Sequence, residues 1–158
     1  VLSTLQFIHF VYQIFGMQFK LQLSTKPKKA LGDDDLWTLA ETEMAAALDT
    51  FTESVDMSWT VNPGDGAFYG PKIDIKVTDS LRRTWQCATV QLDFQLPIRF
   101  KLEYKSPVEG VVERPVIGEL SFMYRCIPRE SCSQFDSLPR TSLTIYKCTA
   151  RSSAAWSA

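Results

Sequence analysis

Four polar residues interrupt an apolar stretch near the middle of the chain, and they are the first candidates for chemistry. In TWQCATVQLDF, residues 84–94, they are Gln86, Thr89, Gln91 and Asp93. A buried polar side chain without a hydrogen-bond partner costs about 1–3 kcal/mol, so four of them in one stretch require partners. A strand with one solvated face would explain Thr89, Gln91 and Asp93, but strict alternation would place Gln86 on the opposite face. The pattern favours a sheet face that binds a polar ligand.

A glycine-rich segment, NPGDGAFYGPKIDIKV at residues 62–77, precedes this stretch. Its spacing is neither the GxxxxGK[ST] of a P-loop nor the GxGxxG of a dinucleotide loop, and it leads into a strand rather than a helix. Pro63–Gly64 is typical of a type II turn, and Asp65–Gly66 of a tight reversal. A purely structural hairpin turn is therefore one interpretation. Glycines also let a ligand approach the backbone closely, which is the other.

The elements that must position these residues can be predicted from periodicity. Apolar residues at three- and four-residue intervals predict helices at 3–15, ended by Gly16, and at 34–51. Alternating patterns predict strands at 17–24, 59–61, 72–77, 84–94 and 113–117. The turn DSLRR joins two of these strands into an antiparallel hairpin.

Composition limits the class of protein. The chain has 158 residues, the size of one ordinary domain, with a net charge of -1 and a pI of about 5.9. This balance does not indicate a basic footprint for nucleic acid over the whole chain, and it leaves open a local basic patch. The apolar residues 1–16 are too few to span a membrane and lack a basic signal-peptide region. Because residue 1 is valine, we expect the chain to come from the inside of a longer protein.

The four cysteines and the single histidine, His9, do not have the spacing of a zinc site. We therefore predict no metal site in this chain. The uneven distribution of the cysteines is also consistent with a reducing compartment.

Three segments together resemble the catalytic domain of threonyl-tRNA synthetase, a class II aminoacyl-tRNA synthetase: LSTKPKKALGDDDLW, NPGDGAFYGPKIDI and WQCATVQLDFQLPIRF. The resemblance runs from about Phe7 to Ile117, in order and with matching spacing. It implies an α+β fold, part of a class II catalytic domain, in which helices flank an antiparallel sheet and ATP and the amino acid lie on the sheet face. The segment CATVQLDFQLPIRF most resembles the eukaryotic cytosolic enzymes, which implies a cytoplasmic protein.

The resemblance also implies a reaction and residue roles. Threonine is joined to ATP as an adenylate, with Mg²⁺ assisting, and the threonyl group passes to tRNA(Thr); the family is typically a homodimer. Gln86 and Thr89 match positions that contact ATP, Tyr69 and Gln91 match positions that line the threonine pocket, and Lys72 matches one near the reacting groups. For Gln86 and Thr89 to serve one site, the strand must carry a bulge or a strong twist between them.

The chain departs from the family pattern in places. The family holds Zn²⁺ through one cysteine and two histidines, but here RPVI is followed by GELSFMYRC instead of the expected histidine, and the other two ligands and the motif 2 arginine would lie upstream. We therefore divide the chain into a synthetase segment, 1–117, and a divergent tail, 118–158, that we expect to be disordered or poorly packed. A translated intron or a frameshift would produce such a tail. Codons for His-Arg-Ala further along the genomic DNA would support this hypothesis.

Two hypotheses on function remain. The chain is a fragment of a threonine–tRNA ligase that is inactive by itself, or it is a catalytically dead binding or regulatory module derived from a class II core. The retained Lys72, Gln86, Thr89 and Gln91 favour the first hypothesis. The missing metal ligands and arginines favour the second.

Overall fold

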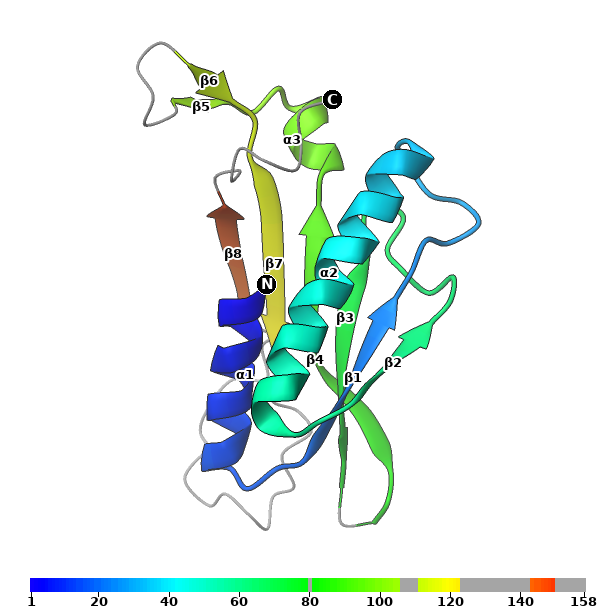
Figure 1. Ribbon diagram of the computed structural model, residues 1–158, viewed down its shortest axis with the longest axis vertical. Coiled ribbons are helices and arrows are strands. Elements are labelled where there is room, and N and C mark those ends of the chain that lie inside the picture. Colours follow the sequence, from blue (N-terminus) through cyan, green and yellow to red (C-terminus); the bar gives the residue numbers. More distant parts are fainter. Residues whose placement is uncertain (80, 106–110, 123–142, 150–158) are drawn as a thin grey trace.

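The computed structural model describes residues 1–79, 81–105, 111–122 and 143–149. In chain order the described elements are α1 Leu2–Ile14, β1 Phe19–Ser24, α2 Asp34–Val55, β2 Trp59–Asn62, β3 Lys72–Thr78, β4 Thr84–Asp93, α3 Gln95–Arg99, β5 Tyr104–Lys105, β6 Val112–Glu113, β7 Val116–Phe122 and β8 Leu143–Thr149. Within these residues, six strands form one sheet in the order β2-β1-β3-β4-β7-β8, while β5 and β6 form a separate pair (Figure 1).

The main sheet is mostly antiparallel. Neighbouring strands run in opposite directions at β1–β3, β3–β4, β4–β7 and β7–β8. The exception is the parallel pair of β1 and β2, which α2 connects, because parallel strands need a crossover and a helix usually supplies it. The predicted α+β class and the β3–β4 hairpin are confirmed.

Helices α1 and α2 cover one face of the sheet, and Figure 1 shows both in front of it. On this face Leu21 of β1 lies opposite Ile75 of β3, and Leu23 lies opposite Ile73. Met44 and Leu48 of α2 pack into the same cluster. The buried residues of this cluster are Leu5, Ile8, Tyr12, Phe19, Leu21, Leu23, Met44, Leu48, Phe51, Ile73, Ile75, Val77, Cys87, Ala88, Val90 and Leu120. Their burial is the main driving force that holds the two layers together.

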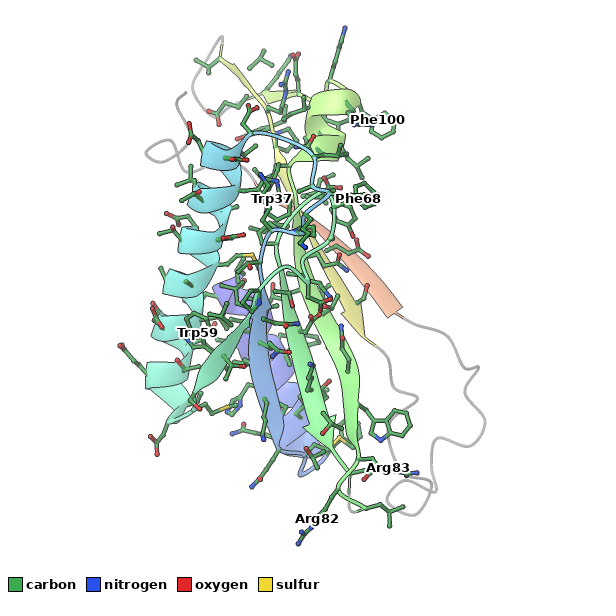
Figure 2. The ribbon with its side chains drawn as sticks, turned by 90° about the vertical axis from the view of Figure 1, so that its right-hand side faces the viewer. Trp37, Trp59, Phe68, Arg82, Arg83 and Phe100 are labelled. Atoms are coloured by element: carbon green, nitrogen blue, oxygen red, sulfur yellow. The ribbon has the colours of Figure 1, made fainter. Side chains whose placement is uncertain are left out.

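The opposite face of the sheet carries the polar residues of the alternating strands. Figure 2 shows α2 on one side of the sheet and this second face turned away from it. When one face of an antiparallel sheet is packed and the other is solvated, apolar and polar residues alternate along each strand. The segment KIDIKV in β3 has this pattern. We call this second surface the open face.

The region after Ile117 differs from the prediction. We expected no element beyond Gly118, but β7 continues through it to Phe122, and β8 pairs along the whole of β7. The sheet therefore does not stop at the predicted boundary. The rest of the divergent tail, 123–142 and 150–158, lies outside the described residues, so its expected poor packing stays a prediction.

No helix within the described ranges is long and apolar enough to cross a membrane. The apolar α1 instead packs Leu5, Ile8 and Tyr12 against the sheet. Its end at Gly16, which adopts a φ of +63°, is the predicted one.

Candidate functional site

A β-bulge in β4 places Gln86 and Thr89 on the open face together. Ile75 of β3 pairs with Ala88, but the next residue, Lys76, pairs with Gln86, so Cys87 is the extra residue of the bulge. The extra residue breaks the strict alternation of faces. Gln86 Nε2 lies 3.4 Å from Thr89 Oγ1, which confirms the predicted irregularity between these two residues.

The carboxylate of Asp74, at the centre of β3, joins these side chains. Its Oδ1 accepts hydrogen bonds from Gln86 Nε2 at 2.6 Å and from Thr89 Oγ1 at 2.5 Å. Its Oδ2 accepts one from Ser24 Oγ at 2.8 Å and lies 3.0 Å from Lys72 Nζ. Asp74 is only 1% exposed. Sequence reasoning missed this residue because alternation alone places it on a polar face, and polar faces are usually solvated.

The glycine-rich loop brings Tyr69 to the same face. Tyr69 donates a hydrogen bond from its hydroxyl to Gln91 Oε1 at 2.5 Å, so the two residues predicted to line one pocket do lie on one side of the sheet. The Phe68 ring packs edge-on against the Tyr69 ring, with centroids 5.0 Å apart. Figure 2 shows Phe68 on the side of the sheet away from α2.

Two glycines hold this loop against the sheet by close backbone contact. Gly66 N–H donates to Thr25 O at 2.8 Å, and a Cβ at Gly66 would meet that oxygen at 2.5 Å. A Cβ at Gly70 would lie only 1.8 Å from Leu92 O. The predicted turn at Pro63–Gly64 is consistent with the φ of +79° at Gly64. The glycines therefore have a packing role here, beside any role in binding.

The strand register continues the site across four strands. One row of cross-strand neighbours on the open face is Ser24, Lys72, Gln91 and Glu119, and the next is Gln22, Asp74, Thr89 and Ser121. Ser121 Oγ lies 3.1 Å from Glu119 Oε1. Both residues follow Gly118, in the segment that the sequence analysis set aside as a tail. Only the pairing of β7 with β4 reveals that they flank the candidate site.

The other polar residue of β4, Asp93, has a different role. Its Oδ1 accepts from the backbone N–H groups of Gln95 and Leu96, at 2.8 and 2.9 Å, and so caps the start of α3. All four polar residues of the stretch thus have hydrogen-bond partners, including the exposed Gln86. Three of them belong to the open face, and the fourth fixes the helix that follows.

The far end of the β3–β4 hairpin is closed by Asp79, well away from the site. Burial would raise the pKa of Asp79, but hydrogen bonds from Trp85 Nε1, the Arg83 backbone and the Arg83 guanidinium outweigh it and lower the pKa to about 2. Figure 2 shows Arg82 and Arg83 at the end of the hairpin opposite to Phe68 and Phe100.

The residues that could bind a transition metal do not meet on the open face. Cys87 is buried in the core on the helix side. His9 lies on α1 with its ring edge-on to Phe19 and Phe51, at 6.0 and 5.8 Å. Within the described ranges, no three residues among histidine, cysteine, aspartate and glutamate gather closely enough to hold a metal ion. The zinc site that the resemblance implies does not fit these residues.

Chemically, the open face offers the amines of Lys72 and Lys76, several amides and hydroxyls, and the carboxylates of Glu119 and of the buried Asp74. Lys72 supplies a positive charge that Asp74 and, at 3.5 Å, Asp65 partly balance. Such a set orients a polar ligand and stabilises developing negative charge on it. This is the chemistry of a positioning surface rather than of covalent catalysis.

Comparisons with known proteins agree with this description. Residues 2–127 match the family described as tRNA synthetase class II core domain (G, H, P, S and T). The chain therefore belongs to the class II aminoacyl-tRNA synthetase core family. Within that family the chain is similar to the core of threonyl-tRNA synthetases, as the following relatives show.

The cytoplasmic threonine–tRNA ligase 1 of Rattus norvegicus is 54% identical over 113 residues, which are 72% of this chain and 16% of that protein. The mitochondrial threonine–tRNA ligase 1 of Arabidopsis thaliana is 50% identical over 117 residues, 74% of this chain and 16% of that protein. A solved structure described as the RNA binding domain of threonyl-tRNA synthetase from Cryptosporidium parvum superimposes with a TM-score of 0.66 at 48% identity, covering 74% of this chain and 28% of that one. The chain thus spans about 16% of the length of the curated relatives it matches.

Proposed function

We propose that this chain forms one wall of the catalytic cleft of a threonine–tRNA ligase, in which threonine and ATP lie on the open face of the sheet. The observation that carries the proposal is the convergence of Tyr69, Lys72, Gln86, Thr89 and Gln91 on that face. The bulge at position 87 and the packed glycine loop produce this convergence, although the five residues come from two separate segments.

In this proposal each residue has a distinct role. Gln86 and Thr89 bind ATP, and Tyr69 and Gln91 bind threonine. Lys72 lies between the two ligands, because its cross-strand neighbour is Gln91 and its ion-pair partner is Asp74. In the reaction, a carboxylate oxygen of threonine bonds to the α-phosphorus of ATP, the bond to the β-phosphate oxygen breaks, and pyrophosphate leaves. The Lys72 ammonium stabilises the negative charge that builds up on the phosphoryl oxygens.

Metal ions that the family uses would need ligands from elsewhere. Both carboxylate oxygens of Asp74 are already occupied by two donors each, so Asp74 does not fit as a Mg²⁺ ligand. For Zn²⁺, the described cysteine and histidine lie on the wrong face, as stated above. In the proposed reaction, any metal ion would therefore be held by other parts of the complete protein.

The larger assembly follows from the same proposal. The complete protein would transfer the threonyl group to tRNA(Thr), act as a homodimer and reside in the cytoplasm. The 158-residue chain by itself would bind the reactants weakly and would not aminoacylate tRNA, because one wall of a cleft cannot position both of them.

The test uses the 158-residue chain and threonylsulfamoyl adenosine, a non-hydrolysable analogue of threonyl adenylate. Calorimetric titration should detect binding, and Gln86→Ala and Gln91→Ala should each weaken it by about 2–10-fold, the value of one hydrogen bond. Gln13→Ala, on the exposed surface of α1, is the matched control and should leave the affinity unchanged.

Two results would count against the proposal. A folded chain that does not bind the analogue at millimolar concentration would favour the alternative, a binding or regulatory module that no longer uses the cleft. Threonine-dependent exchange of pyrophosphate into ATP by the chain alone would refute the claim that it is inactive by itself.

A further inference from the structure

Asp74 has a position that no role assigned so far explains. It is almost completely buried, although it lies on the open face, and four side chains from three strands converge on its two oxygens. An ionised carboxylate accepts hydrogen bonds and cannot donate them. Every neighbour of Asp74 must therefore turn a donor toward it.

This requirement fixes the orientation of Gln86. Its amide can rotate to present either Nε2 or Oε1 to a neighbour, and the two groups are distinguished only by their partners. Because Asp74 accepts from Nε2 at 2.6 Å, Oε1 must point the other way, toward the solvent side of the open face. Gln86 Oε1 has no partner in the described part of the chain, and Gln86 itself is exposed there.

Asp74 constrains Thr89 and Lys72 in the same way. The Thr89 hydroxyl donates its proton to Asp74 Oδ1 at 2.5 Å, and its oxygen already accepts from Gln86 Nε2 at 3.4 Å, which leaves one lone pair of that oxygen as an acceptor. The Lys72 ammonium is held beside Oδ2 at 3.0 Å, so its long side chain has one preferred position on the face.

We propose that Asp74 is a positioning residue that sets the hydrogen-bond polarity of the open face, so that Gln86 and Thr89 present acceptor oxygens to the ligand. The ligand group they select is a hydrogen-bond donor, a hydroxyl or an amino group. The identity of the ligand rests on the proposed function. The orientation of the Gln86 amide does not.

The experiment uses the 158-residue chain, two substitutions and their combination. Asp74→Asn keeps the size of the side chain but introduces a donor, so the Gln86 amide should reverse and present Nε2 to the ligand. The affinity for threonylsulfamoyl adenosine should then fall about tenfold. Gln86→Glu alone should also weaken binding, because it places two carboxylates within hydrogen-bond distance.

The double variant with both substitutions gives the sharpest test. The introduced amide at position 74 can donate to the introduced carboxylate at position 86, whose second oxygen again faces the ligand as an acceptor. The affinity should return to within about threefold of the unchanged chain. Such a rescue would show that Asp74→Asn acts through hydrogen-bond polarity, because loss of structure would not be rescued in this way. A folded double variant that binds no better than Asp74→Asn alone would overturn the proposal.

A readout without ligand separates this proposal from the proposed function. In the nuclear magnetic resonance spectrum, one side-chain amide proton of Gln86 should resonate downfield of those of Gln13 and move toward them in Asp74→Asn. Gln86 amide protons that already resemble those of Gln13 in the unchanged chain would overturn the proposal without any variant. If the analogue fails to bind at all, the proposed function falls, and this spectrum still decides the role of Asp74.

Discussion

The close contact at Gly70 gives the most specific stability prediction. A Cβ at this position would lie 1.8 Å from Leu92 O and 2.9 Å from Leu92 C, both backbone atoms that cannot rotate away. Ordinary contact begins at 3.4 Å, so Gly70→Ala must separate the loop from the end of β4 by about 1.6 Å. The hydrogen bond from Leu92 N–H to Pro71 O, now 3.1 Å long, cannot survive such a shift.

The cost follows from these two losses. Overpacking of this kind costs about 1–3 kcal/mol, and the lost backbone hydrogen bond adds about 0.5–1.5 kcal/mol. Gly70→Ala should therefore lower the free energy of unfolding by roughly 2–4 kcal/mol, a large share of the stability of an ordinary domain. It should also displace Tyr69 from Gln91, since Tyr69 is the preceding residue.

Urea unfolding measures the loss in free energy of unfolding. Hydrogen exchange of the Leu92 amide measures the loss of its hydrogen bond to Pro71 O. Gly16→Ala is the control: its Cβ would meet nothing within 4 Å, so its cost is limited to the positive φ of that residue. We expect about 1–2 kcal/mol for the control. If Gly70→Ala cost no more than the control, or left the Leu92 amide protected, the packing argument would be wrong.

Three further predictions concern charge and packing. Lys72→Met should lower the free energy of unfolding by about 1.5–3 kcal/mol in urea, because it removes a charged donor from buried Asp74. Lys76→Met, whose partner is a neutral amide oxygen, should cost at most about 1.5 kcal/mol, and equal costs for the two would contradict this account. Leu48→Ala should cost about 2–5 kcal/mol by the same measurement, since Leu48 is 0% exposed between α2 and the sheet, and a loss below 1 kcal/mol would show that the two layers do not pack as described. Because the pKa of Asp79 is lowered from 3.8 to about 2 in the folded chain, its stabilising effect is present above pH 3.8 and is lost as the pH falls toward 2. The melting temperature of Asp79→Asn should lack that part of the acid dependence, and an unchanged profile would refute it.

Much of the fold could be predicted from periodicity, because the covered face of the sheet imposes alternation on each strand. The predicted helix at 3–15 and strand at 72–77 lie within one residue of α1 and β3 at each end. The parallel pairing of β2 with β1 was not predicted, since short strands carry no signal of direction. Helix α3 was missed as well, because Pro97 and its five-residue length hide any helical period.

The candidate site shows the same division. Side chains that need partners are visible in the sequence, and Gln86 in an apolar stretch already required an irregular strand. Asp74 could not be identified as their partner from the sequence, because its burial depends on contacts with Ser24 of β1 and with Lys72, two residues earlier in β3. Glu119 and Ser121 were missed for a related reason, since only the register of β7 against β4 places them beside Gln91 and Thr89.

One measurement tests the convergence of the open face most directly. The isotope-labelled chain is titrated with threonylsulfamoyl adenosine, and the shifts of its amide resonances are mapped residue by residue. The account predicts that the shifts concentrate at Tyr69, Lys72, Gln86, Thr89 and Gln91, with little change on α1. Shifts that gather on the helix-covered side, or at Tyr69 and Gln91 without Gln86 and Thr89, would contradict a common cleft for the nucleotide and the amino acid.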